Sequence, residues 1–96
     1  MDAIQVARAC DELHEAIEHD PEKNLDLYAT SLGIVWHLKE RATWGYPLDL
    51  LTRIELLIAQ WFSPAIWCDE ANKLSCRQRL VELISKLEDG WERPRA

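Results

Sequence analysis

The 96-residue chain is long enough to enclose one hydrophobic core but too short to add an enclosed catalytic cavity of the usual kind. Apolar residues make up 48% and charged residues 29% of it, a balance that excludes disorder over most of its length. Residues 1–26 hold eight acidic and two basic residues, which accounts for the whole net charge of −6 and argues against direct nucleic-acid binding.

Other features bear on where the protein resides. The most apolar stretch, residues 48–62, is interrupted by charged and polar side chains, so we expect no membrane span. The first residues lack a basic segment followed by an apolar one, and the three cysteines form no C-x-x-C pair. Both observations favour a reducing compartment, so we expect a cytoplasmic protein.

The first half of the chain predicts two helices. Asp2 suits the N-cap of a first helix, whose apolar residues recur at helical spacing. These residues are Ile4, Val6, Cys10, Leu13 and Ile17. Asp20-Pro21 predicts the start of a second helix that runs to about residue 43, because aspartate suits an N-cap and proline the first helical position.

The second helix is apolar over so much of its circumference that we expect it to be central in the bundle or shared with a partner. Trp36 is expected on its buried side. Gly33, with Ala29 one turn earlier, predicts a close approach of two backbones.

The second half predicts further short connections and helices. In Trp44-Gly45-Tyr46-Pro47, the glycine is expected in the left-handed conformation that ends a helix, and the same is expected of Gly90. A third helix over residues 48–62 shows an apolar stripe that includes Leu57 and Trp61. Ser63-Pro64 predicts a short helix to about residue 71, and Ser75-x-x-Gln78 a last helix over residues 76–89, unless residues 64–89 form one kinked helix.

These elements predict an all-α fold. We expect a compact bundle of four to five helices with short antiparallel connections. Residues 1–91 then form a single helical domain, and residues 92–96 a flexible C-terminal tail.

The histidines and cysteines give little support to catalysis or metal binding. His14 and His19 are five residues apart and lie on different sides of a helix, so they cannot hold one zinc ion. Cys10 and His14 have the spacing of half a zinc site, but nothing fixes its other ligands. We expect no metal, no cofactor and no enzyme activity; the alternative is a small helical enzyme or redox protein that uses Cys76 at a helix N-terminus.

Acidic residues gather on one side of the first helix. Asp11, Glu15 and Glu18 follow i, i+4 and i+7 spacing, with Glu12 beside them and Glu22 beyond the turn. Like charges at this spacing destabilise a helix by a few tenths of a kcal/mol per pair, so local stability does not explain them. A solubility surface, attraction of a basic protein and imitation of nucleic-acid phosphates all remain open.

Tryptophan is abundant, with five residues. Trp36 and Trp61 are expected in the core. Trp44, Trp67 and Trp91 lie near helix ends, where they either seal the bundle or form an interface with a partner.

We therefore expect a small acidic helical protein-binding module, acting as an inhibitor, an antitoxin-like protein or an adaptor. Its partner is expected to be a protein with a basic surface, and a homodimer through the second helix is compatible with this function. The predicted partner-binding residues are Asp11, Glu12, Glu15, Glu18, Glu22, Trp44, Trp67 and Trp91. The alternative function is a nucleic-acid mimic that blocks a nuclease or a DNA-binding protein through the acidic first helix.

Overall fold

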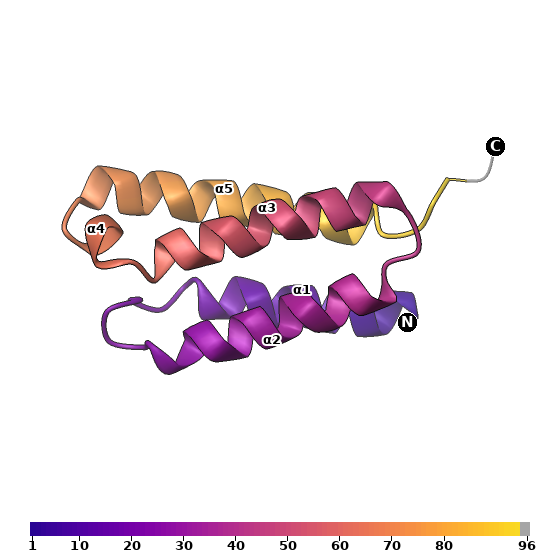
Figure 1. Cartoon of the computed structure of the whole chain (residues 1–96), viewed down its shortest axis with the longest axis horizontal. Helices are drawn as coiled ribbons and strands as arrows, with labels where there is room; N and C mark the ends of the chain where they lie inside the picture. Colours follow the sequence, from indigo (N-terminus) through magenta and orange to yellow (C-terminus); the bar gives the residue numbers. More distant parts are fainter. Residues whose placement is uncertain (95–96) are drawn as a thin grey trace.

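Four long helices and one single-turn helix make up the structure, a computed structural model that describes residues 1–94 (Figure 1). The helices are α1 (Ala3–Ala16), α2 (Asp26–Arg41), α3 (Gly45–Trp61), α4 (Pro64–Trp67) and α5 (Glu70–Asp89). No strand occurs in the described part of the chain, which confirms the all-α prediction. Within residues 1–94, no helix combines the length and the apolar character needed to cross a bilayer.

The long helices form a ring in which each one packs on two neighbours. α2 packs on α1 and α3, and α5 packs on α3 and α1, while the short α4 lies in the connection between α3 and α5. In Figure 1, α2 and α3 form the nearer layer and α1 and α5 the farther one. Short connections between successive antiparallel helices produce this arrangement, as predicted.

The core contains one apolar stripe from every long helix. Burial of such side chains contributes roughly 1.5–3 kcal/mol each, relative to leaving them exposed. The fully buried aliphatic side chains of the four long helices are Val6, Leu13, Val35, Leu38, Leu51, Ile54, Ile58, Leu80, Ile84 and Leu87.

The start of α1 follows the prediction. The Asp2 carboxylate accepts a hydrogen bond from the backbone N–H of Gln5 at 2.9 Å, and the Gln5 side chain accepts one from the Asp2 N–H at 3.1 Å. This reciprocal capping box satisfies two backbone donors that the helix leaves free. Ile4, in contrast to its prediction, is exposed.

The start of α2 differs from the prediction. Asp20 and Pro21 form a turn, in which the Asp20 carboxylate accepts a hydrogen bond from the Glu22 N–H at 3.1 Å. The Asn24 side chain donates to the Asp20 carbonyl at 2.8 Å and closes that turn. Since these two short polar side chains satisfy the turn's own backbone, α2 begins only at Asp26.

The prediction that Gly45 and Gly90 adopt the left-handed conformation is also wrong. No glycine in residues 1–94 has a positive φ angle, and Gly45 is the first residue of α3 rather than the end of α2. Pro47 lies in the first turn of α3, where a missing N–H breaks no helical hydrogen bond. Gly90 serves close packing, because a Cβ atom there would clash with the ring of Tyr46.

The last helix begins six residues earlier than predicted. The Asp69 carboxylate accepts hydrogen bonds from the N–H groups of Ala71 and Asn72, at 3.0 and 3.2 Å, and is the N-cap of α5. Ser75 therefore lies inside α5 and caps nothing. α4 and α5 are separate helices, so the alternative of one kinked helix is wrong.

The last described residues differ in burial. Trp91 is buried and belongs to the helical body, while residues 92–94 of the predicted tail are exposed. The rest of that tail, residues 95 and 96, lies outside the described part of the chain.

Gly33 does not mark a close approach of two backbones within the chain. It lies on the solvent side of α2, and a Cβ atom added there would meet no other atom within 4 Å. A glycine at an exposed position inside a helix costs about 1 kcal/mol relative to alanine. Nothing inside the described molecule compensates for that cost.

The substitution Gly33→Ala is therefore expected to raise the free energy of unfolding in dilute solution by about 0.5–1 kcal/mol. The matched control is Ala29→Gly, one turn earlier and also exposed, which should lower it by a similar amount. Urea unfolding followed by circular dichroism measures both. A loss of stability in Gly33→Ala would show that the position is not open.

Candidate functional site

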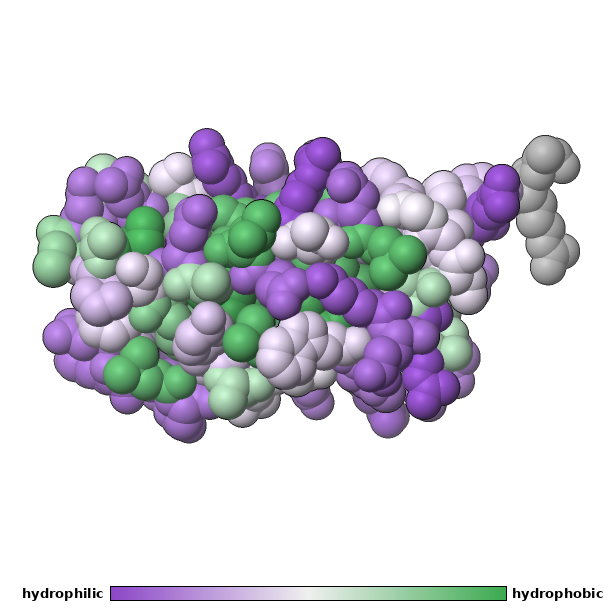
Figure 2. Space-filling model, in the orientation of Figure 1, coloured by the Kyte–Doolittle hydropathy of each residue, from purple (hydrophilic) through white to green (hydrophobic). Residues whose placement is uncertain are grey.

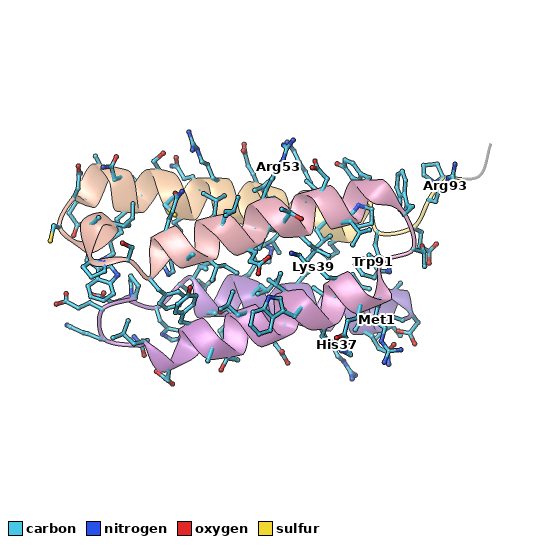
Figure 3. The ribbon with its side chains drawn as sticks, viewed as in Figure 1. Met1, His37, Lys39, Arg53, Trp91 and Arg93 are labelled. Carbon is cyan, nitrogen blue, oxygen red and sulfur yellow. The ribbon has the colours of Figure 1, made fainter. Side chains whose placement is uncertain are left out.

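The predicted tryptophan patch is not formed. Trp91 is only 6% exposed, and its carbonyl accepts a hydrogen bond from the indole N–H of Trp44 at 3.0 Å. Trp44 is half-buried, and its ring packs against Tyr46 with centroids 5.6 Å apart. Figure 3 shows Trp91 at the end of the bundle where α2 connects to α3. Trp44 and Trp91 therefore close this end.

Trp67 belongs to the opposite end. It lies in α4, half-buried, and its indole N–H donates to the Trp61 carbonyl at 3.1 Å. The three tryptophans assigned to a partner surface are thus divided between the two ends of the molecule. The indole N–H groups of Trp44 and Trp67 donate to backbone carbonyls of the chain itself. These hydrogen bonds support the alternative that the tryptophans seal the bundle.

The open tryptophan is Trp36, which the sequence placed in the core. It is 52% exposed, because the core side of α2 is occupied by Ser31, Val35 and Leu38. Position 36 follows Val35 by about 100° around the helix and is turned outward, toward α3. The expectation that Trp36 is buried is therefore wrong, whereas Trp61 is buried as expected.

The indole of Trp36 is held in place by α3. Its N–H donates to Oε1 of Glu55 at 2.8 Å, while Lys39 donates to Oε2 of the same carboxylate at 2.5 Å. Figure 3 shows Lys39 between α2 and α3. The hydrogen bonds from Lys39 and Trp36 hold the pKa of Glu55 below its ordinary value. The tryptophan thus presents a fixed ring face to the solvent.

Around Trp36 lies an apolar surface, here named the α2–α3 face. Leu25 is 51% and Leu56 63% exposed, and small residues leave the backbone of α2 open beside them. Figure 2 views this layer from outside and shows hydrophobic side chains over both helices, on either side of a hydrophilic strip. The α2–α3 face consists of Leu25, Ala29, Leu32, Gly33, Trp36, Leu48, Leu56 and Ala59.

Two contacts join α2 and α3 beneath the α2–α3 face. The rings of Tyr28 and Phe62 stack with centroids 5.2 Å apart and join the start of α2 to the end of α3. The Trp36–Glu55 hydrogen bond joins the two helices near their middle. These contacts, one at an end of the helix pair and one near its middle, set the register of α2 against α3.

Charges within this layer nearly balance. Residues 26–61, from the first residue of α2 to the last of α3, hold three basic and four acidic residues, a net charge of −1. Lys39 pairs with Glu55, and Arg53 pairs with Asp49 at 3.2 Å, so two ion pairs account for four of these seven charges. A partner that contacts the α2–α3 face therefore meets apolar surface and little net charge.

The acidic residues lie elsewhere. Asp11, Glu12 and Glu15 are exposed on α1, in the other layer, and Glu18 and Glu22 are exposed in the segment that follows it. Among residues 1–94, none of these five forms an ion pair with a basic side chain. The nearby Asp20 does, with Lys73 at 3.6 Å. The acidic residues and the α2–α3 face are thus separate surfaces.

Cys76 does not lie at a helix N-terminus, the position at which its thiol was expected to be activated. Cys76 is buried in the interior of α5, its Sγ lies 3.6 Å from the Leu57 carbonyl, and burial raises the pKa of its thiol. Burial and the nearby acidic side chains Glu88 and Asp11 raise the pKa of Cys10 to about 12. Within residues 1–94, no three His, Cys, Asp or Glu side chains are grouped so that they could hold a metal ion.

The sequence contains a second apolar stripe on α2 that includes Trp36, but periodicity alone does not tell which of the two stripes is buried. Leu25, Ala29, Leu32 and Trp36 follow i, i+4, i+7 and i+11 spacing, which is an apolar stripe as regular as the one that is buried. A helix with two such stripes can bury only one of them in a ring of four.

Compared with known protein families, curated proteins and solved structures, the chain shows no significant match in any of the three comparisons.

Thiol labelling tests the placement of the cysteines. Cys68 is exposed, whereas Cys10 and Cys76 are buried, so one thiol per native chain should react with a maleimide and all three after denaturation. Raising the pH from about 7 to about 9 should not make Cys10 react with the maleimide, because its thiol stays protonated. In the control variant Cys68→Ser, labelling of the native protein should vanish. Rapid labelling of that variant would contradict the burial of the other two.

Proposed function

We propose that this protein is a protein-binding module that acts through the α2–α3 face. The observation that carries the proposal is Trp36, half exposed, fixed by Glu55 and surrounded by exposed apolar residues. Single exposed leucines are common on soluble proteins, but exposed apolar side chains on both sides of a half-exposed tryptophan are typical of binding sites. Inhibitors, antitoxin-like proteins and adaptors all act by such contacts.

The rigidity of the face supports the same proposal. Binding costs conformational freedom for each side chain that becomes ordered, about 0.5–1.5 kcal/mol. The Glu55 carboxylate already fixes the Trp36 indole, and Tyr28 and Phe62 already fix the helices beneath it. A partner therefore gains apolar burial at this face while much of the ordering has already occurred.

The acidic surface contributes differently. It lies on α1, which packs on α2 but not on α3, whereas Trp36 lies on the side of α2 that faces α3; salt screens exposed charges that are more than about 8 Å apart. Asp11, Glu12 and Glu15 therefore attract a basic protein during approach, mainly at low salt, and add little to contacts at Trp36. Affinity belongs to the apolar face.

A second candidate function is supported by the open carboxylates themselves. Asp11, Glu15 and Glu18 are exposed, and among residues 1–94 no basic side chain pairs with them. We infer that such a row also suits imitation of nucleic-acid phosphates toward a nuclease or a DNA-binding protein. Binding of that kind depends on α1 and leaves Trp36 uninvolved.

Substitutions in the α2–α3 face test the first proposal. Trp36→Ala and Leu56→Glu should each weaken capture of the partner by about tenfold or more, because centrally placed tryptophans and apolar contacts dominate binding energy. Tagged wild-type and variant chains are compared by affinity purification from source cells and mass spectrometry. Leu74→Glu on α5, also exposed, is the matched control and should retain the partner. A partner retained by both face variants would contradict the proposal.

Charge reversal of Asp11, Glu12, Glu15 and Glu18 to lysine separates the two candidates. For binding of a basic protein through Trp36, the association rate at low salt should fall while the dissociation rate stays nearly constant. For phosphate mimicry, binding should be lost altogether. Surface plasmon resonance with the captured partner at two salt concentrations measures both rates. Unchanged association at low salt would reject any role for the acidic surface.

A further inference from the structure

We propose that the occupant of the α2–α3 face is a second copy of this chain, with α3 of each copy lying over α2 of the other. The inference rests on the proposed function, because it names the partner for the same face. Three features of the face, its charge, its shape and its size, identify that partner.

The low net charge of the α2–α3 face favours a partner whose own contact surface carries little net charge. Residues 26–61 carry a net charge of only −1, and Lys39 and Arg53 are already paired within the chain. A basic surface gains little here, since most of the acidic excess lies in residues 1–25. Two copies that meet face to face bring two nearly neutral surfaces together and keep both acidic α1 helices in the outer layers. The mutual repulsion of two chains of charge −6 is then smallest.

The shape of the face includes a projecting side chain, Leu56, and an open space at Gly33 that could receive it in a second copy. Trp36 is level with Glu55 through their hydrogen bond, so Leu56, the next residue, is level with the turn of α2 that contains Gly33. Leu56 projects from the edge of α3 that faces away from α2, because it follows Glu55 by about 100°. Gly33 lies on the edge of α2 that faces away from α3, with open space where a Cβ would be.

A two-fold axis parallel to the helices brings these features together. It places α3 of one copy over α2 of the other at the same level, with Leu56 of each copy against Gly33 of the other. Such an isologous contact repeats at both edges of the interface. It explains why a glycine, which is less favourable than alanine inside a helix, occupies a position that touches nothing within the chain.

The size of the face sets the expected strength. α2 and α3 have 16 and 17 residues, and are therefore about 25 Å long. Two helices side by side are about 20 Å wide, so the contact buries roughly 1,000 Å² in total, the size found in weak, reversible complexes. The dimer is therefore expected to dissociate on dilution.

Sedimentation velocity of the full chain, from about 1 µM to about 1 mM, tests the proposal. The wild type should shift from monomer to dimer over this range. Gly33→Leu should weaken the dimer by about tenfold or more by filling the space for Leu56, while the monomer keeps or gains thermal stability because the site is open. Leu56→Glu should weaken it similarly, and Leu74→Glu on α5 should leave it unchanged.

Cross-linking tests the arrangement. Gly33→Cys and Leu56→Cys are made separately in a Cys68→Ser background, which removes the exposed native thiol. On mild oxidation, a mixture of the two should form a disulfide-linked pair, and neither protein alone should do so efficiently. Efficient linking of Gly33→Cys to itself would overturn the placement of α3 over α2.

A chain that stays monomeric at the highest concentration would overturn the proposal, as would a dimer that survives both Gly33→Leu and Leu56→Glu. The outcome for the proposed function is separate. A monomeric chain that captures another protein through Trp36 overturns only the second copy as occupant. A monomeric chain whose captured proteins are indifferent to the face overturns both.

Discussion

The bundle depends on burial of one apolar stripe from each of its four long helices in a common core. α1, α3 and α5 each bury one stripe, and outside it they also expose some large apolar side chains, such as Ile4, Leu56 and Leu74. α2 brings two apolar stripes, of which the ring buries the one that contains Val35 and Leu38. The other stripe, with Trp36, remains open for a geometric reason, because a helix in a ring of four has only one side turned to the centre.

The same geometry separates charge from apolar surface. Seven of the eight acidic residues of the first 26 positions lie at the N-cap of α1, on α1 or in the segment that follows it, and the nearly balanced charges of residues 26–61 lie on α2 and α3. Because α1 lies in the other layer, the side formed by α2 and α3 shows apolar areas and is near neutral, while most of the excess charge is on and beside α1. An association through the side formed by α2 and α3 does not bring the two α1 helices together.

The predicted helix caps at Asp20 and Ser75 are wrong for a common reason, because a short polar side chain can bond to backbone groups in a turn as well as at a helix end. Asp20 resembles a helix cap but satisfies a turn together with Asn24, and Ser75 resembles a cap but lies within a helix already capped by Asp69. Each side chain had the right chemistry for the predicted role. Which backbone donor it meets depends on the packing of the helices that follow.

The sequence alone determined the all-α class, the N-cap at Asp2, the buried stripe of α3 and the location of the excess charge, because each depends on local spacing or composition. The tertiary structure alone decided which tryptophans are open. Trp91 is covered because the chain folds back on the end of the bundle, and Trp36 is open because α2 turns its other stripe to the core. Periodicity identifies an apolar stripe, but only the positions of neighbouring helices determine which stripe is buried.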